Sequence, residues 1–166
     1  MVGGIMNKTN IPQGFTLSMA VMDCLPVLFF SIGFAVLATR FNSHLFRLGI
    51  FLVILVGALK AGWKFVIALC HKDLNVLNKQ MRFLMPIGFV LMLVAMVIDR
   101  NKWSWNAMIN HITRMPANLF FLGGIIGIIA LIWFAKHQDG RDAKVNWKEQ
   151  AINSFTQLCI MLGILF

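Results

Sequence analysis

The sequence predicts an all-α integral membrane protein: a bundle of about five transmembrane helices with a short interfacial amphipathic helix between spans three and four. Hydrophobic residues make up 59% of the chain and charged residues 13%, whereas a typical soluble domain carries roughly 25% charged residues. The apolar residues are grouped into continuous runs, each near the ~17–25 residues that a spanning helix needs. Because the runs are continuous rather than alternating, they argue against a closed β-barrel.

The predicted spans occupy most of a single domain, residues 1–166. They run from about Phe15 to Thr39, Leu48 to Cys70, Phe83 to Ile98, Ala117 to Ala135 and Gln150 to Phe166. The links between them are short. The segment from Lys136 to Glu149 is charged and contains Gly140, so we expect an exposed loop there.

The longest link, from Asn101 to Met115, has a pattern of its own. Trp105, Met108, Ile109 and Ile112 recur at helical spacing, while polar residues lie between them. A short helix with one apolar face is typical of a segment that lies in the membrane interface. The alternative is a plain loop with an aromatic anchor.

The distribution of Lys and Arg predicts the orientation. One side of the membrane would hold the N-terminus and eight basic residues: Lys8, Lys72, Lys79, Arg82, Lys136, Arg141, Lys144 and Lys148. The other side would hold five: Arg40, Arg47, Arg100, Lys102 and Arg114. The positive-inside rule then favours an inside N-terminus and an outside C-terminus, in a plasma or inner membrane.

The net charge of +9 is interpreted as contact with anionic membrane lipids. No basic stripe is interleaved with stacking aromatic residues, so nucleic acid is not an expected partner.

Two lysines within the second span are the strongest signal of a functional site. Lys60 lies near the middle of that span, and Lys64 follows one helical turn later on the same face. A lysine at the bilayer centre costs about 2.5–3.5 kcal/mol on insertion scales. A carboxylate, an anion or water is therefore expected beside them.

Three polar residues are predicted to share that layer. Asp23 lies inside the first span at a depth similar to that of Lys64, so an ion pair between them is expected. Asn153 and Gln157 lie in the first two turns of the fifth span and enter from the same side. These three residues, with Lys60 and Lys64, form the predicted substrate-binding site. A purely structural role, in which Asp23 neutralises Lys64 and the amides join helices, stays open.

No catalytic, cofactor or metal site is predicted. The cysteines Cys24, Cys70 and Cys159 form no CxxC pair, and the chain has no HExxH, GxSxG or P-loop motif. The histidines lie near span ends or in links. These observations argue against an enzyme without excluding one.

Small residues in the fourth span offer a packing face. Gly123 and Gly127 form one GxxxG step, which lets helices approach closely, either within the chain or in a homo-oligomer or a complex with a membrane partner.

Three functions therefore remain. The first is binding or movement of a small anionic solute through a cavity lined by lysine and aspartate. The second is a non-catalytic membrane subunit, or an assembly or partner-binding protein, in which Lys60 pairs with an acidic residue of another chain. The third is a membrane enzyme that acts on a lipid or isoprenoid phosphate.

Overall fold

The computed structural model describes residues 16–70, 75–137 and 143–166. These residues form α-helices and one short 3₁₀ turn, with no strand among them, which confirms the all-helical prediction. The elements are α1 (Leu17–Phe41), α2 (His44–Cys70), α3 (Asn75–Ile98), η1 (Arg100–Lys102), α4 (Trp105–Thr113), α5 (Ala117–His137) and α6 (Ala143–Leu165).

Four of the described helices are long and apolar enough to cross a membrane: α1, α2, the Lys79–Ile98 part of α3, and α5. Large apolar side chains on α3 and α5 point away from the bundle, and Phe83 and Val97 are each 73% exposed. A soluble monomer rarely exposes so much contiguous apolar surface. Helix α6 is 23 residues long but falls outside this group, because polar residues fill its first half.

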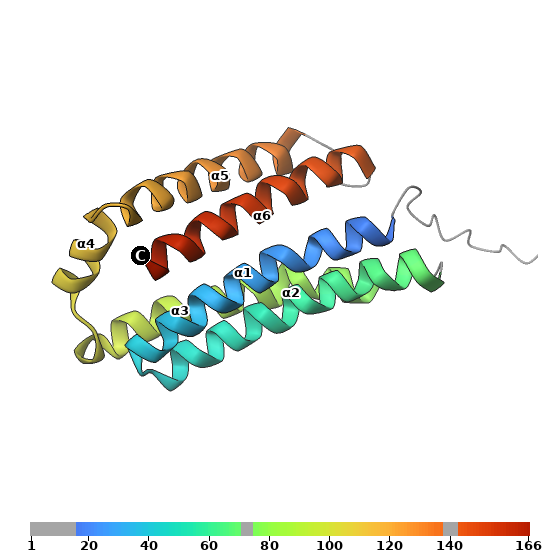
Figure 1. The fold of residues 1–166 in the computed structure, drawn as a ribbon. Coiled ribbons are helices and arrows are strands. Elements are labelled where there is room, and N and C mark those ends of the chain that lie inside the picture. Colours follow the sequence, from blue (N-terminus) through green and yellow to red (C-terminus); the bar gives the residue numbers. More distant parts are fainter. Residues whose placement is uncertain (1–15, 71–74, 138–142) are drawn as a thin grey trace, which may run out of the picture.

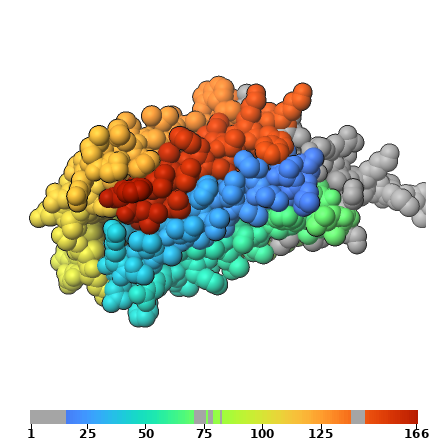
Figure 2. Space-filling model, viewed as in Figure 1, coloured from blue at the N-terminus to red at the C-terminus, as the bar shows by residue number. Residues whose placement is uncertain are grey.

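The long helices pack side by side in the order α5, α6, α1, α2 and α3 (Figure 1). The last helix in the sequence therefore lies between α5 and the first helix. Helices α1 and α6 run parallel and lie against each other across the face shown in Figure 2. This placement brings the start of α6 to the same end of the bundle as the start of α1 and the end of α2.

Local signals begin and end the first two helices. Thr16 accepts a hydrogen bond from the Met19 N–H at 3.4 Å and caps α1. Asn42, in the left-handed conformation at φ 36°, ends α1, a position that Asn tolerates better than most side chains. Ser43 then accepts a hydrogen bond from the Phe46 N–H at 3.1 Å, which caps α2. The tight turn makes α1 and α2 antiparallel neighbours.

The main apolar core lies between α1, α2 and α3. It consists of Phe30, Phe41, Phe46, Ile50, Val53, Met92 and Ala95. Helices α2 and α3 approach so closely that a Cβ on Gly49 would lie 2.7 Å from the carbonyl oxygen of Gly88. This contact leaves no room for any larger residue, so glycine sets the distance between the two helices.

The glycines of α5 face α6 within the same chain. Gly124 and Gly127 are buried, and a Cβ on Gly127 would overlap the hydroxyl of Thr156. A Cβ on Gly123 would lie 3.2 Å from the sulfur of Cys159. The small-residue face predicted at Gly123 and Gly127 is therefore covered by α6, and a homo-oligomer through it stays a prediction.

A polar latch joins the turn before α2 to the end of α3. The hydroxyl group of the buried Ser43 donates a hydrogen bond to the Asp99 carboxylate, and Lys102 Nζ lies 2.9 Å from Asp99 Oδ1. The hydrogen bond from Ser43, then that from Lys102, holds the pKa of Asp99 below its ordinary value. Next to this latch, Trp103 donates its indole N–H to the carbonyl of Met96 at 2.9 Å.

Several predicted boundaries need correction. The helix that contains the predicted third span begins at Asn75, before the predicted start of the span at Phe83, and the helix that contains the second begins at His44, before Leu48. The predicted loop from Lys136 to Glu149 was wrong for its last residues, since α6 begins at Ala143. Charged residues end a hydrophobic run, but they do not end a helix, and a helix can continue past the apolar layer.

A helix is present within the link from Asn101 to Met115, over Trp105–Thr113. Ser104 caps it by accepting a hydrogen bond from the Ala107 N–H at 3.4 Å. Trp105 and Ile109 are exposed. Its position at the membrane interface stays a prediction.

Replacing Gly127 with Ala should destabilise the protein by about 1–3 kcal/mol, because the added methyl group overpacks the contact with Thr156. Gly62→Ala is the matched control, since a Cβ there meets nothing within 4 Å. Thermal unfolding of both variants in detergent measures the difference. Equal unfolding temperatures would contradict the packing of α5 on α6.

Replacing Asp99 with Asn should remove part of the acid sensitivity of the fold. Because the folded pKa lies below the ordinary value of 3.8, ionised Asp99 stabilises the fold above that value, and this contribution is lost as the pH falls below about 4. The unfolding temperature of the wild type should therefore drop more steeply than that of Asp99→Asn between about pH 5 and pH 3. Parallel curves for the two proteins would show that the latch contributes nothing.

Candidate functional site

A buried ion pair joins α1 to α2 as the sequence predicts. Lys64 Nζ lies 2.6 Å from Asp23 Oδ2, and the two side chains are 1% and 3% exposed. Asp23 is six residues from the start of α1, and Lys64 is six residues from the end of α2. Antiparallel packing therefore places both roughly 9 Å along their helices from the same end of the bundle.

A glycine on α2 lets the two helices approach near this pair. Gly57 is buried, and a Cβ added there would lie 2.9 Å from a methyl group of Val27 on α1. Gly57 lies two turns before Lys64 on the same face of α2. The close contact brings the short side chain of Asp23 within reach of the ammonium group.

A third residue, on α6, contacts the ion pair, and it was not predicted from the sequence. Lys64 Nζ donates a hydrogen bond to Asn146 Oδ1 at 2.8 Å, and Asn146 is 7% exposed. One turn later, Gln150 is 2% exposed. Both residues were assigned to a loop or to the edge of the last span. The signal that could have found them is a polar stripe at helical spacing: Asn146, Gln150, Asn153 and Gln157.

The predicted position of Gln157 needs correction. Because α6 begins at Ala143, Gln157 lies 14 residues into the helix, or roughly 21 Å from its start. It is therefore much deeper than Lys64 rather than level with it. Asn153 lies ten residues into α6, and Lys60 lies ten residues before the end of α2, so these two share a depth of roughly 15 Å.

Several buried polar atoms of α1 and α6 have no hydrogen-bond partner within the described parts of the chain. They are Asp23 Oδ1, Ser154 Oγ and Gln157 Oε1. Buried polar atoms are normally satisfied by protein or by ordered water. The interface of α6 with its neighbours therefore has unused hydrogen-bonding capacity beside the ion pair and above it.

Lys60 differs from Lys64 in its surroundings. Its side chain is half-buried, and in residues 16–70, 75–137 and 143–166 no carboxylate forms an ion pair with it. Lys64 by contrast is already neutralised by Asp23. Of the two lysines of α2, Lys60 is therefore the one without a carboxylate partner in the described residues, and its partial exposure makes it reachable from outside the chain.

The described part of the chain offers no group of three or more His, Cys, Asp or Glu side chains that could hold a metal ion. The cysteines at positions 24, 70 and 159 are free thiols. The chemistry of the site is therefore that of an ammonium group, a carboxylate and amides, which can bind charge and share protons but present no evident nucleophile.

The shallow groove that the structure shows lies elsewhere. It is lined by Leu93, Met96, Val97, Arg100 and Trp105. These residues belong to the end of α3, to η1 and to α4, at the opposite end of the bundle from Lys64 (Figure 1). The groove is therefore not the predicted cavity around the intramembrane lysines.

In the described residues these features define an all-helical bundle with four helices long and apolar enough to cross a membrane and with a buried ion pair between α1 and α2. Comparison with protein-family models, with curated proteins and with solved structures finds no match to this chain. The interpretation of the site therefore rests on its own geometry.

Removing Lys64 alone should destabilise the protein more than removing the whole pair. Lys64→Met leaves the Asp23 carboxylate buried without a counter-charge, which costs about 3–5 kcal/mol. The double variant Asp23→Asn with Lys64→Met should recover much of that loss. The double-mutant cycle is measured by urea or thermal unfolding in detergent. If the effects of the two substitutions on the free energy of unfolding are additive, the two charges do not interact.

Proposed function

We propose that the chain is a five-span membrane protein in which α6 is the fifth span. The burial pattern of α6 supports this: Gln150, Ser154 and Thr156 are each at most 7% exposed, whereas Phe155 is 58% exposed. These three uncharged polar residues therefore face the bundle, and the apolar Phe155 faces outward. Mean hydropathy undervalues such a helix, because it counts side chains that lipid does not contact.

In the same proposal α4 lies on the membrane surface at one end of the bundle. Trp105, Ile109 and Ile112 are exposed, which provides an apolar face for the interface. The Lys and Arg counts of the sequence favour the side of the N-terminus as the inside of a plasma or inner membrane, which would put α4 on the outer surface.

We infer that the bundle binds a small anionic solute and moves it across the membrane. The observation that carries this proposal is Lys60: a half-buried lysine near the middle of a span, with no ion pair in the described residues. An anion beside it would offset the cost of holding a charged ammonium group at that depth. Asn153 lies at a similar depth and could donate an amide hydrogen bond to the same anion.

In this proposal Asp23, Lys64 and Asn146 position α1, α2 and α6 around the solute. Because Asp23 already neutralises Lys64, the binding charge is that of Lys60 alone. Gln157 and Ser154 supply polar atoms farther along the same helix interface. A row of such atoms is what a polar solute needs to replace its hydration shell.

The second candidate is a membrane subunit that recognises a partner chain. The partial exposure of Lys60 favours it, because a carboxylate in a transmembrane helix of another protein could reach the same ammonium group. An enzyme acting on a lipid or isoprenoid phosphate is supported by nothing beyond the basic side chains. The first two candidates differ in what lies against Lys60.

Replacing Lys60 with Met should lower anion flux by about tenfold or more, since a hydrogen bond to a charged group contributes about 1.5–3 kcal/mol. The measurement is uptake of chloride, acetate and inorganic phosphate into vesicles that contain the purified chain. Lys148→Met, at an exposed position of α6, is the control with the same loss of charge.

Wild-type vesicles without flux for any of these anions would count against solute movement. If Lys60→Met instead releases a protein that co-purifies with the wild type, the partner-binding candidate is supported. Lys148→Met should retain that protein.

A further inference from the structure

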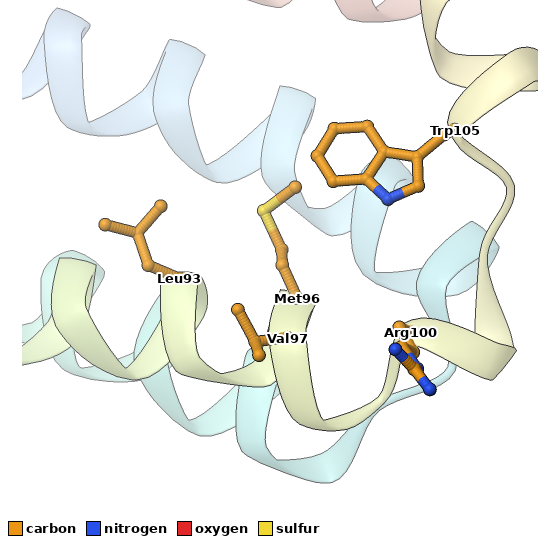
Figure 3. Close-up of a pocket in the computed structure, with 5 residues that line it drawn as sticks. All are labelled: Leu93, Met96, Val97, Arg100 and Trp105. Carbon is orange, nitrogen blue, oxygen red and sulfur yellow. The ribbon is translucent and has the colours of Figure 1, made fainter.

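The side chains that line the groove at the end of α3 change from apolar to basic along its length. Leu93, Met96 and Val97 line it along α3, Arg100 follows on η1, and the indole of Trp105 lies above the row (Figure 3). Figure 3 shows the side chain of Met96 extending toward the indole of Trp105. The groove has a volume of about 350 Å³, which is within the ~300–1,000 Å³ of small-molecule sites.

The apolar part of this groove lies where hydrocarbon is expected. The Lys79–Ile98 segment of α3 can cross a membrane, and Leu93 and Val97 are 63% and 73% exposed. Arg100 follows directly after the last residues of that segment. The change from apolar to basic side chains therefore coincides with the change from acyl chains to headgroups.

The wall formed by Trp105 is held in place by its neighbours. The ring centroids of Trp103 and Trp105 are 4.2 Å apart. Trp103 is itself fixed by its hydrogen bond to the carbonyl of Met96 at 2.9 Å. Because this wall is already ordered, less conformational entropy is lost when a ligand binds in the groove.

The charge of Arg100 is not used within the described residues. Asp99, the neighbouring carboxylate, is engaged by Ser43 and by Lys102. Arg100 is exposed, and in the described segments no ion pair or side-chain hydrogen bond involves it. Its guanidinium group presents a fork of N–H donors that matches a phosphate group.

We propose that this groove binds one anionic phospholipid. Its phosphate contacts Arg100, and one acyl chain lies along Leu93, Met96 and Val97 beneath the indole of Trp105. The proposal requires only that α3 crosses the membrane, and it is independent of the role given to Lys60.

The test compares two lipids with identical dioleoyl chains, phosphatidylglycerol and phosphatidylcholine. The full-length protein in non-ionic detergent is titrated with each lipid, and bound lipid is counted by native mass spectrometry. The wild type should retain one phosphatidylglycerol in preference to phosphatidylcholine, because both carry the phosphate but only phosphatidylcholine adds a choline cation that repels Arg100. Arg100→Gln should weaken phosphatidylglycerol binding about tenfold, the equivalent of about 1.4 kcal/mol.

Two control variants distinguish a specific lipid site from general attraction of an anionic lipid to a basic protein. Arg114→Gln removes one charge at the same end of the bundle, outside the groove, and should change binding less than about twofold. Val97→Trp fills the groove but keeps Arg100, and it should weaken binding of both lipids. Because Arg100 and Val97 are exposed, unfolding temperatures close to that of the wild type should accompany all three variants.

Three results would overturn the proposal. Equal losses in Arg100→Gln and Arg114→Gln would indicate unspecific charge attraction. Displacement of the lipid by millimolar inorganic phosphate would indicate an anion site without a place for the acyl chain. Unchanged lipid binding in Val97→Trp, together with a dimer that this variant disrupts, would indicate that a second copy of the chain covers the groove.

Discussion

The structure depends on how one ammonium group is kept within an apolar bundle. Lys64 is 1% exposed, and a lysine in such a place needs counter-charge and hydrogen bonds to offset its lost hydration. Asp23 supplies the charge from α1, and Asn146 supplies a carbonyl from α6. Because the three groups belong to three helices, this single requirement fixes the depth of each helix relative to the others.

The two ends of the bundle are stabilised in different ways. Near the start of α1, charge and amides join α1, α2 and α6. At the other end, the apolar core around Phe30 and Ile50 is closed by the latch of Ser43 and Asp99. Glycines set helix distances, as Gly49 does for α2 and α3 and Gly127 does for α5 and α6. The fold thus combines polar specificity at one end with dense packing elsewhere.

The sequence was sufficient to predict the helices and the Asp23–Lys64 pair, because long apolar runs and a lone intramembrane carboxylate allow few alternatives. It was insufficient to predict the depth of Asn146 and Gln157 in the bundle. Their depth depends on where α6 begins, and hydropathy marks the apolar layer rather than the ends of a helix. The packing order of the helices was also not predictable from the sequence, since no local pattern indicates that α6 lies between α5 and α1. The groove at Arg100 arises only where α3, η1 and α4 meet.

The position of α6 has a consequence for assembly in the membrane. Helices α1 to α3 share a core, whereas α6 follows them in the sequence and packs back against α1. Until α6 docks, Lys64 lacks its hydrogen bond to the side-chain carbonyl of Asn146, and the side of α1 that α6 covers is open. Docking of α6 therefore completes the polar contacts of Lys64, and a helix with no amide at position 146 could not supply this hydrogen bond.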